Sequence, residues 1–377
     1  MPGTPGQSKQ ATFLLPARTR LAAAALPASL ARALGRADAL PRGDPGEQAQ
    51  LLRHFELLPH GWPVAALTRA LDANDAPLSA WLRADPAYVR PDINGARLLA
   101  CGEALELDRR DADALLPALR PLFGDAGFPL DAPDPHRWYL RLPREARLPT
   151  FIAPADALGA DLFDQLPGAN DASPEGRRWR ALLSEAQVVL HNHPHNVARI
   201  AAGRVPVNSL WFWGAGIAPD HVTTLHAAIS GGDDLLQALG KAAGVRAALA
   251  GDAFSVPDAD TLVDLRGNRD ATRLQAAWLL PAVAAVQRRE IDRLVLDFED
   301  GARFSLEPGQ RWRFWRRPRQ ALAERPASSA AGSRNARGPA MPGPTMFRRC
   351  CAASTPRAAR MATTRRARSS RTCPRPG

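Results

Sequence analysis

The chain has 377 residues, enough for one large domain or two ordinary ones with a sizeable apolar core. Its formal net charge of +11 lies in residues 326–377, which hold 11 of the 49 basic residues and none of the 38 acidic residues. The rest of the chain is formally neutral and has one cysteine, Cys101. These facts exclude a general nucleic-acid-binding field, an internal disulfide framework and a thiolate metal site there.

Both ends of the sequence are predicted to be disordered. Residues 1–10 are rich in Gly, Pro and Ser, and residues 326–377 in Arg, Ala and Pro, so neither end can bury enough surface to fold. We interpret the tail as a solvated extension, with a basic arm for nucleic acid or an anionic membrane as the alternative. Residues 21–31 resemble the apolar part of a signal peptide, but Pro27 interrupts them. We therefore expect a helix from Pro27, no membrane-spanning segment and a cytoplasmic bacterial protein.

The first half of the sequence favours helices. Apolar residues spaced by three and four positions recur through residues 47–120. Together with the turn-forming residues, they predict the following elements in chain order: a strand at 12–15, a helix over 47–58, a helix over 111–122, a loop over 125–136, strands at 137–142 and 150–152, and a loop over 166–176.

The second half alternates helices and strands. Ser173 is suited to cap a helix that begins at Pro174, and Pro194 ends the apolar pattern of that helix. The elements predicted after it are a short helix over 196–203, strands at 207–213 and 222–229, helices over 233–243 and 270–289, a hairpin of 292–298 with 303–306, and a final strand over 311–317. Trp312 and Phe314 are expected to pack inward from that last strand, with a surface that stacks nucleic-acid bases as the alternative for residues 311–317. The alternation predicts an α/β fold.

The densest group of polar side chains lies in residues 190–216, where a predicted strand runs into two glycines. Ligands of open α/β sheets bind beyond the carboxyl ends of strands, and glycine lets backbone amides approach an anion. The predicted ligand-binding residues are His193, Asn196, Arg199, Asn208, Gly214 and Gly216. Arg204, like Arg199, could donate two hydrogen bonds to a phosphate or carboxylate. The alternative is structural: a capping asparagine, a solvated Arg199 and a glycine turn.

A metal site is a weaker interpretation of the same region. Imidazole is a common zinc ligand, and the candidates are His191, His193, His195, Asp220 and His221, with His226 as a further option. Because Pro194 places the first three at a helix exit, we favour loop histidines. Cys101 is predicted to belong to the core, and Asp258, Asp260 and Asp264 to solvated strand ends. No G-x-S-x-G nucleophile motif occurs.

The pattern H-P-x-N-x-x-R-x-x-x-G-x-x-P-x-N over residues 193–208, followed by G-x-G at 214–216, resembles archaeal-type cofactor-independent phosphoglycerate mutases of the alkaline-phosphatase superfamily. With Arg90-Pro91-Asp92, residues 116–127, Trp138-Tyr139 and residues 312–317, the body also resembles the bacterial phosphoglycerate-mutase-like family that includes regulatory protein E of the Xanthomonas Rpf cluster. The resemblance implies a degenerate alkaline-phosphatase-superfamily-like α/β core over residues 11–325, with two lobes at 11–165 and 166–325 as an option. Active members use two metal ions and a serine nucleophile.

This sequence departs from the active members in several ways. The predicted first strand has no acid, no serine-nucleophile segment is recognisable, no histidine follows His226, and Trp213 replaces an arginine before G-x-G. The two-metal mechanism therefore cannot be carried over. We expect a protein without cofactor that binds a small phosphorylated or carboxylated molecule in a regulatory role, with no assignable catalytic residue. The alternatives are an active mutase or phosphatase with Mn or Zn, and a protein that binds nucleic acid through its basic tail.

Overall fold

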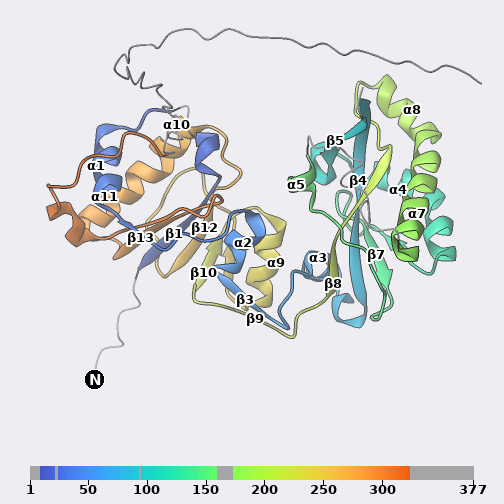
Figure 1. Cartoon of the computed structure of the whole chain (residues 1–377), viewed down its shortest axis with the longest axis horizontal. Helices are drawn as coiled ribbons and strands as arrows, with labels where there is room; N and C mark the ends of the chain where they lie inside the picture. The colour runs from blue at the N-terminus through green and yellow to red at the C-terminus, as the bar shows by residue number, and fades with distance from the viewer. Residues whose placement is uncertain (1–8, 22–23, 93–94, 159–172, 323–377) are drawn as a thin grey trace, which may run out of the picture. The chain divides into compact units, whose positions relative to one another are not determined.

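The structure, a computed structural model, describes residues 9–21, 24–92, 95–158 and 173–322 (Figure 1). The predicted tail over 326–377 lies outside these ranges, as do most of residues 1–10 and of the loop predicted at 166–176. No helix within the described ranges is long and apolar enough to cross a membrane.

A seven-stranded sheet has the order β11-β10-β12-β1-β13-β14-β2. The strands β11, β10, β12, β1 and β13 are mutually parallel, whereas β14 is antiparallel to both of its neighbours. The bounds are β1 Gln10–Leu15, β2 Asp38–Ala39, β10 Ala228–Ser230, β11 Arg246–Ala248, β12 Thr261–Asp264, β13 Arg293–Phe298 and β14 Arg303–Leu306. The prediction of an α/β fold and of the hairpin between β13 and β14 is confirmed.

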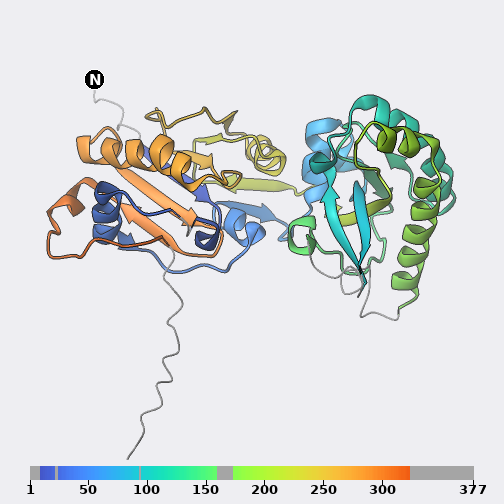
Figure 2. The ribbon, with the colours of Figure 1, turned by 90° about the horizontal axis from the view of Figure 1, so that it is seen from above.

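Helices bury both faces of this sheet. The central strand β1 alternates its side chains, so Phe13 and Leu15 enter one apolar cluster with α1, α10 and α11, while Leu14 enters another with α2 and α9. Figures 1 and 2 show α11 running along the sheet. The helices are α1 Ala28–Arg36, α2 Glu47–Leu52, α9 Asp234–Ala242, α10 Ala271–Leu274 and α11 Leu280–Arg288, with a π-helical turn at Gln275–Leu279 joining the last two.

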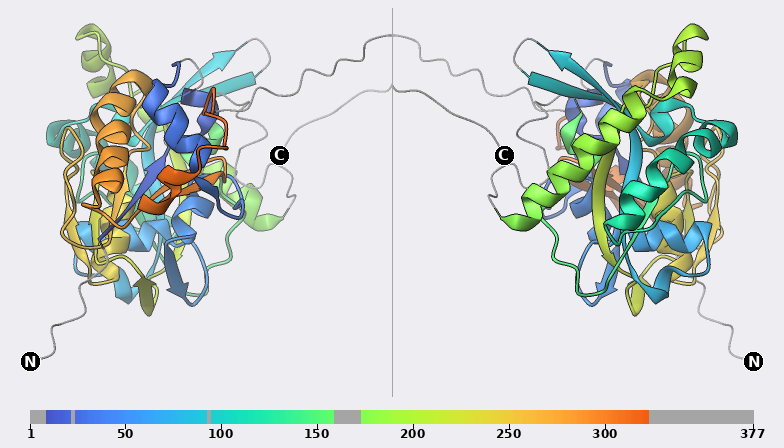
Figure 3. Two further views of the ribbon diagram at one scale, coloured as in Figure 1. Left: turned by 90° about the vertical axis from the view of Figure 1, so that its left-hand side faces the viewer. Right: turned by 90° about the vertical axis from the view of Figure 1, so that its right-hand side faces the viewer.

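A second, antiparallel sheet has the order β5-β4-β7-β6, and β8 also pairs with β4. Helices α4 and α7 cover one face of it (Figure 3). Under them Trp179 stacks on Phe128 and meets Phe212 edge to face. The bounds are β4 Ala80–Asp92, β5 Gly95–Cys101, β6 Leu130–Asp131, β7 Tyr139–Leu142, β8 Ser209–Ile217, α4 Arg109–Asp125, α5 Pro154–Ala157, α7 Pro174–His191 and α8 Pro194–Ala201.

A short ribbon and one helix connect the two sheets along the chain. The strands β3 (Phe55–Leu58) and β9 (His221–Thr224) pair antiparallel, and helix α3 (Val64–Asp72) packs against both α9 and β8. Because β1 and β2 from the start of the chain share a sheet with β10 to β14, the two sheets do not follow the expected lobe boundary between residues 165 and 166.

Several predicted elements are wrong. The helix over 47–58 ends at Leu52, and the residues after it form β3. The helical reading of residues 47–120 also fails over 80–101, where β4 and β5 form because long-range pairing with β7 and β8 satisfies their backbone. The predicted strand at 222–229 is two strands, β9 and β10, and no strand forms at 150–152. The short predicted helix begins at Pro194, with His193 in place of Asn196 at its N-cap.

The predicted final strand over 311–317 is also wrong. A 3-10 turn spans Pro308–Trp312, and irregular backbone follows it. Trp312 and Phe314 do not pack inward. Trp312 is 65% exposed and Phe314 is 79% exposed.

Candidate functional site

A cavity of about 850 Å³ brings together residues that are far apart in the sequence. Its wall takes side chains from β4, β8, the start of α9 and the loop before β7. The polar residues in this wall are Glu47, Gln48, Thr68, Arg83, Asp85, Glu103, His136, Arg137, Asp156, Asp233, Asp234 and Arg269. A large concave site with buried ionisable groups is the usual setting for ligand binding.

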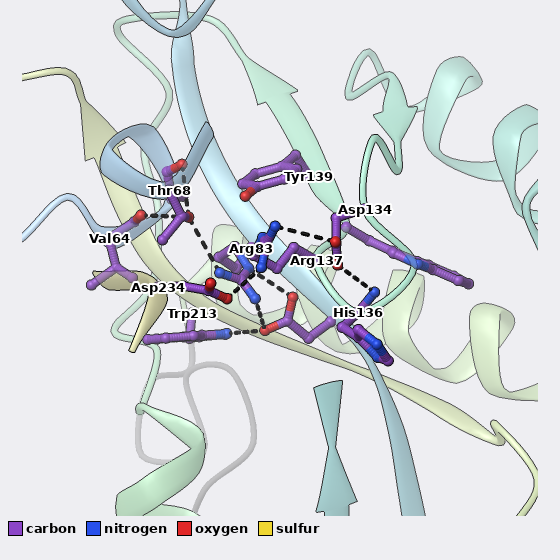
Figure 4. Close-up of polar contacts among 12 residues, drawn as sticks. Val64, Thr68, Arg83, Asp134, His136, Arg137, Tyr139, Trp213 and Asp234 are labelled. Carbon is purple, nitrogen blue, oxygen red and sulfur yellow. Dashed lines mark hydrogen bonds and ion pairs between the residues drawn. The ribbon is translucent and has the colours of Figure 1, made fainter. Parts of the chain in front are cut away.

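A buried ion pair lies at the centre of the wall. Arg83 and Asp85 are two residues apart on β4, so both point to the same face, and the Arg83 guanidinium donates two hydrogen bonds of 2.7 and 2.9 Å to the carboxylate. The indole N–H of Trp213 donates a third, at 2.7 Å, and Arg83 reaches the hydroxyl of Thr68 at 3.2 Å. Burial raises the pKa of Asp85 despite this pairing. Figure 4 shows Thr68, Arg83 and Trp213 converging on one another.

A second arginine connects three elements beside this pair. Arg137 donates to both carboxylate oxygens of Asp72, at 2.6 and 2.8 Å, and also binds Asp234 at the start of α9. The hydroxyl of Tyr139 donates to Asp72 at 2.6 Å. Burial opposes the charge of Arg137, but its carboxylate partners outweigh burial and raise the pKa of the guanidinium. Burial is also the main reason why the pKa of Tyr139 is raised, so the phenol stays protonated.

Two basic side chains of the wall are not committed to carboxylates. The ring nitrogen Nδ1 of His136 is buried and has no hydrogen-bond partner among the described residues. Arg269 is exposed, and within the described ranges it forms no ion pair. These two groups are available to an anionic ligand.

A third arginine occupies the carboxyl ends of the parallel strands. Arg266 donates to both oxygens of Asp264, at 2.8 and 2.9 Å, and also meets Glu47 at 2.8 Å and Asp233 at 3.1 Å. Burial would lower the pKa of Arg266, but its carboxylate partners raise it. Burial raises the pKa of Asp233 and of Glu47. Asp264, predicted as a solvated strand end, is instead part of this cluster.

The residues at this edge do not fit the two-metal centre that the resemblance implies. The segment Leu15-Pro16-Ala17 at the end of β1 offers no acid, and the guanidinium of Arg266 takes the position between the carboxylates. Among the described residues, no group of three or more His, Cys, Asp or Glu side chains is arranged to hold a metal ion. The weak candidates are distributed over α7 (His191), α8 and its cap (His193, His195) and the region of β9 (Asp220, His221).

The predicted ligand-binding residues lie apart from this cavity. Asn196 bonds the carbonyls of Leu190 and Val207 and accepts the Val207 N–H, and Asn208 bonds both backbone groups of Val89. His193 accepts the N–H of His195 as a cap. These contacts join α7, α8 and the segment before β8, and Asn208 also ties that segment to β4. Binding of a ligand by these side chains stays a prediction.

Arg199 is wholly buried in an ion-pair network. It donates to Asp111 at 2.5 Å and to the carbonyls of Leu105 and Val205, while His195 and Arg204 also meet Asp111, at 2.6 and 3.2 Å. Burial raises the pKa of Asp111, but hydrogen bonds from His195, the Asp108 N–H and Arg199 outweigh it and lower the pKa. The network ties α4 to α8.

The two predicted glycines serve close packing. Gly214 has φ of +67°, and a Cβ there would lie 2.8 Å from Cβ of Val64 in α3. A Cβ at Gly216 would lie 2.6 Å from Pro63. Only glycine lets β8 approach α3 this closely, which places the neighbouring Trp213 in the cavity wall.

A buried histidine pair lies beside Asp297 of β13. His54 Nε2 meets Asp297 at 3.0 Å, His54 Nδ1 meets His226 Nε2 at 3.0 Å, and His226 Nδ1 meets Asp260 at 2.8 Å. Each of these three hydrogen bonds needs one ring proton, whereas two neutral imidazoles carry only two ring protons between them. Burial lowers the pKa of His54, although Asp297 opposes that shift, so the third proton binds only below the ordinary value of 6.5.

Sequence reasoning missed Arg83, Asp85 and Arg137 as site residues. The signal for the first two was present in the sequence R-A-D, in which Arg83 and Asp85 alternate as the side chains of a strand do. The helical interpretation of that region concealed it. Cys101, predicted to be core, is half-buried beside the cavity, and burial raises the pKa of its thiol well above the usual range.

Comparisons with known proteins give a partial match. No family model matches the chain. A probable 2,3-bisphosphoglycerate-independent phosphoglycerate mutase of Geobacter sulfurreducens is 33% identical over 102 residues, which are 26% of this chain and 24% of that protein. The corresponding mutase of Methanosarcina acetivorans is 34% identical over 116 residues, 29% of this chain and 27% of that protein. This chain is distantly similar to cofactor-independent phosphoglycerate mutases. The matched segments span about a quarter of the length of these relatives.

Two solved structures are similar over most of their length, but at low scores. A protein from Pyrococcus horikoshii matches with a TM-score of 0.43 and 12% identity, over 80% of this chain and 88% of that one. A cofactor-independent phosphoglycerate mutase from Thermoplasma acidophilum matches with a TM-score of 0.33 and 17% identity, over 80% of this chain and 89% of that one. The narrower resemblance to the Xanthomonas regulatory type stays a prediction.

Proposed function

We propose that this phosphoglycerate-mutase-like chain binds a small phosphorylated or carboxylated molecule in the cavity walled by Arg83, His136 and Arg137, and that it acts in regulation. The observation that carries the proposal is the pairing of charges in the wall. Asp85 is paired with Arg83, and Asp234 shares Arg137 with Asp72, while His136 and Arg269 remain uncommitted. His136 and Arg269 are therefore the groups that an anion entering the cavity would bind.

Further acids also line the wall. Glu47 and Asp233 share the single positive charge of Arg266 with Asp264. Glu103 and Asp156 are exposed at the rim, where water screens their charge. The ligand class fits the distant similarity to mutases, whose names refer to phosphoglycerate.

We derive no chemical step for this site. The internal cation Arg266 takes the place between the carboxylates at the strand ends, and the chain's own residues supply donors, orientation and burial. Binding without turnover fits a regulatory role, in which ligand occupancy stabilises one state of the protein.

Calorimetric titration tests the binding. 3-Phosphoglycerate, glycerate and inorganic phosphate should bind, and uncharged glycerol should not. The double variant His136→Ala/Arg269→Ala should weaken binding at least tenfold, because it removes the two uncommitted donors. The matched control His60→Ala/Arg120→Ala removes the same residue types from exposed positions outside the cavity and should bind as the original chain does. Equal affinities for the two variants would overturn the proposed site.

A coupled mutase assay tests the active-enzyme alternative. The protein is assayed with Mn, Mg and Zn in turn, after its fold is checked by circular dichroism. Metal-dependent turnover would favour an enzyme with replaced ligands. A folded protein that binds 3-phosphoglycerate without turnover is the result that we expect.

A further inference from the structure

The segment of residues 311–317, which we call the aromatic–arginine segment, exposes three large rings. Trp312, Phe314 and Trp315 are 65%, 79% and 68% exposed, although core packing is the usual place for such side chains. Arginines flank the rings at 311, 313, 316 and 317. An exposed aromatic cluster of this kind marks an interaction surface.

The rings are held in different orientations. Phe314 and Trp315 meet edge to face, with centroids 5.4 Å apart and an interplanar angle of 81°. The Arg311 guanidinium lies over the Trp312 ring, 4.9 Å from its centroid. All three rings are more than half exposed, so a flat partner can reach them, and Arg311 adds a cation beside Trp312.

A small basic hollow adjoins the rings. It has a volume of about 230 Å³, lies between α1, α11 and the 3-10 turn, and is lined by Arg32, Arg36 and Arg311 with Ser29 and Gln287. Within the described ranges, no carboxylate pairs with Arg32 or Arg311. Glu307 also lines the hollow, but Arg293 lies 3.5 Å from its carboxylate. The hollow has the size and the donors for one phosphate group.

The local charge supports an anionic partner. Six arginines surround the rings and the hollow, namely Arg32, Arg36, Arg311, Arg313, Arg316 and Arg317, against two carboxylates. Asp38 is one of these and is satisfied by Arg313, whose hydrogen bond lowers its pKa. In Figure 1 the deep-orange chain after β14 lies beside α1, which supplies Arg32 and Arg36.

We propose that this surface binds single-stranded nucleic acid, with a phosphate in the arginine hollow and bases stacked on Trp312, Phe314 and Trp315. Stacking platforms joined to backbone-binding cations are how proteins bind single strands without reading sequence. An anionic membrane is the less suitable partner, because insertion needs a continuous apolar face, and here arginines separate Trp312 from Phe314 and follow Trp315.

Fluorescence anisotropy with labelled twelve-nucleotide poly(U) and poly(dT) tests the proposal on the full chain. The triple variant Trp312→Ala/Phe314→Ala/Trp315→Ala should weaken binding by about tenfold for each ring that stacks a base. Every variant retains residues 326–377, so binding through the basic tail is a common background. Thermal unfolding followed by circular dichroism checks that the variants fold.

Charge is tested separately by the salt dependence. Arg32→Ala/Arg311→Ala should reduce the slope of log affinity against log salt by about 0.7 for the one phosphate in the hollow. The control Arg110→Ala/Arg120→Ala removes equal charge from α4 and should leave the slope unchanged. Unchanged affinity of the folded aromatic variant, or binding to phosphatidylserine vesicles but not to oligonucleotides, would overturn the proposal.

Discussion

Replacing Asp111 by Asn tests whether the buried network around Arg199 holds the antiparallel half of the protein together. Asp111 is 1% exposed and accepts from Arg199, which has no exposed surface, and from His195 and Arg204. The amide keeps the shape but removes the charge. Breaking one partner of a buried ion pair costs about 3–5 kcal/mol. Because Arg199 keeps two carbonyl acceptors, we expect a loss of about 3 kcal/mol, the lower end of that range.

The assay is urea unfolding followed by tryptophan fluorescence and circular dichroism at pH 7. Asp113→Asn is the matched control on the same helix, because its ion pair with Arg109 is exposed and is worth about 0.5 kcal/mol or less. The low pKa of Asp111 adds a second signature. The original chain should lose the stability of this pair as the pH falls below 3.8, whereas Asp111→Asn should lack that loss. Equal free energies of unfolding for the two variants at pH 7 would refute the reasoning.

Three further predictions concern the other buried features. The free energy of unfolding should fall as the pH falls below 6.5, because His54 takes up its proton at a higher pH in the unfolded chain than in the folded protein. The variant His54→Gln should flatten that slope between pH 7 and 5.5. Gly214→Ala should cost about 1–3 kcal/mol in urea unfolding, whereas Gly124→Ala, in open space on α4, should be neutral or stabilising; similar effects would contradict the packing argument. Arg266→Met should destabilise by about 3–5 kcal/mol at pH 8 and by less at pH 5, where the abandoned carboxyls can take up protons, a difference that Arg269→Met should not show.

The sequence by itself determined two inner strands of the seven-stranded sheet, β1 and β13. Strands such as β1 and β13 are buried on both faces, so their apolar runs are visible without knowing the partner. The helices α4, α7 and α9 were also predictable, because each has a polar N-cap and an apolar stripe at helical spacing. Local sequence was sufficient wherever the decisive contacts lie within one element.

Only the tertiary structure decided β4 and the site on it. The residues of β4 form a strand because β5, β7 and β8 pair with it from distant parts of the chain. That pairing places Arg83 and Asp85 on one face beside Trp213, while the conspicuous Arg199 is consumed by a buried acid from α4.

The same limit applies to charge and exposure. The sequence suggested that Arg199 was a free cation and that Trp312 was a core residue, and the structure gives the opposite environment for both. The residue type determines which hydrogen bonds and ion pairs a side chain can form. The long-range contacts decide whether other residues of the protein already occupy those groups or whether a ligand can bind them.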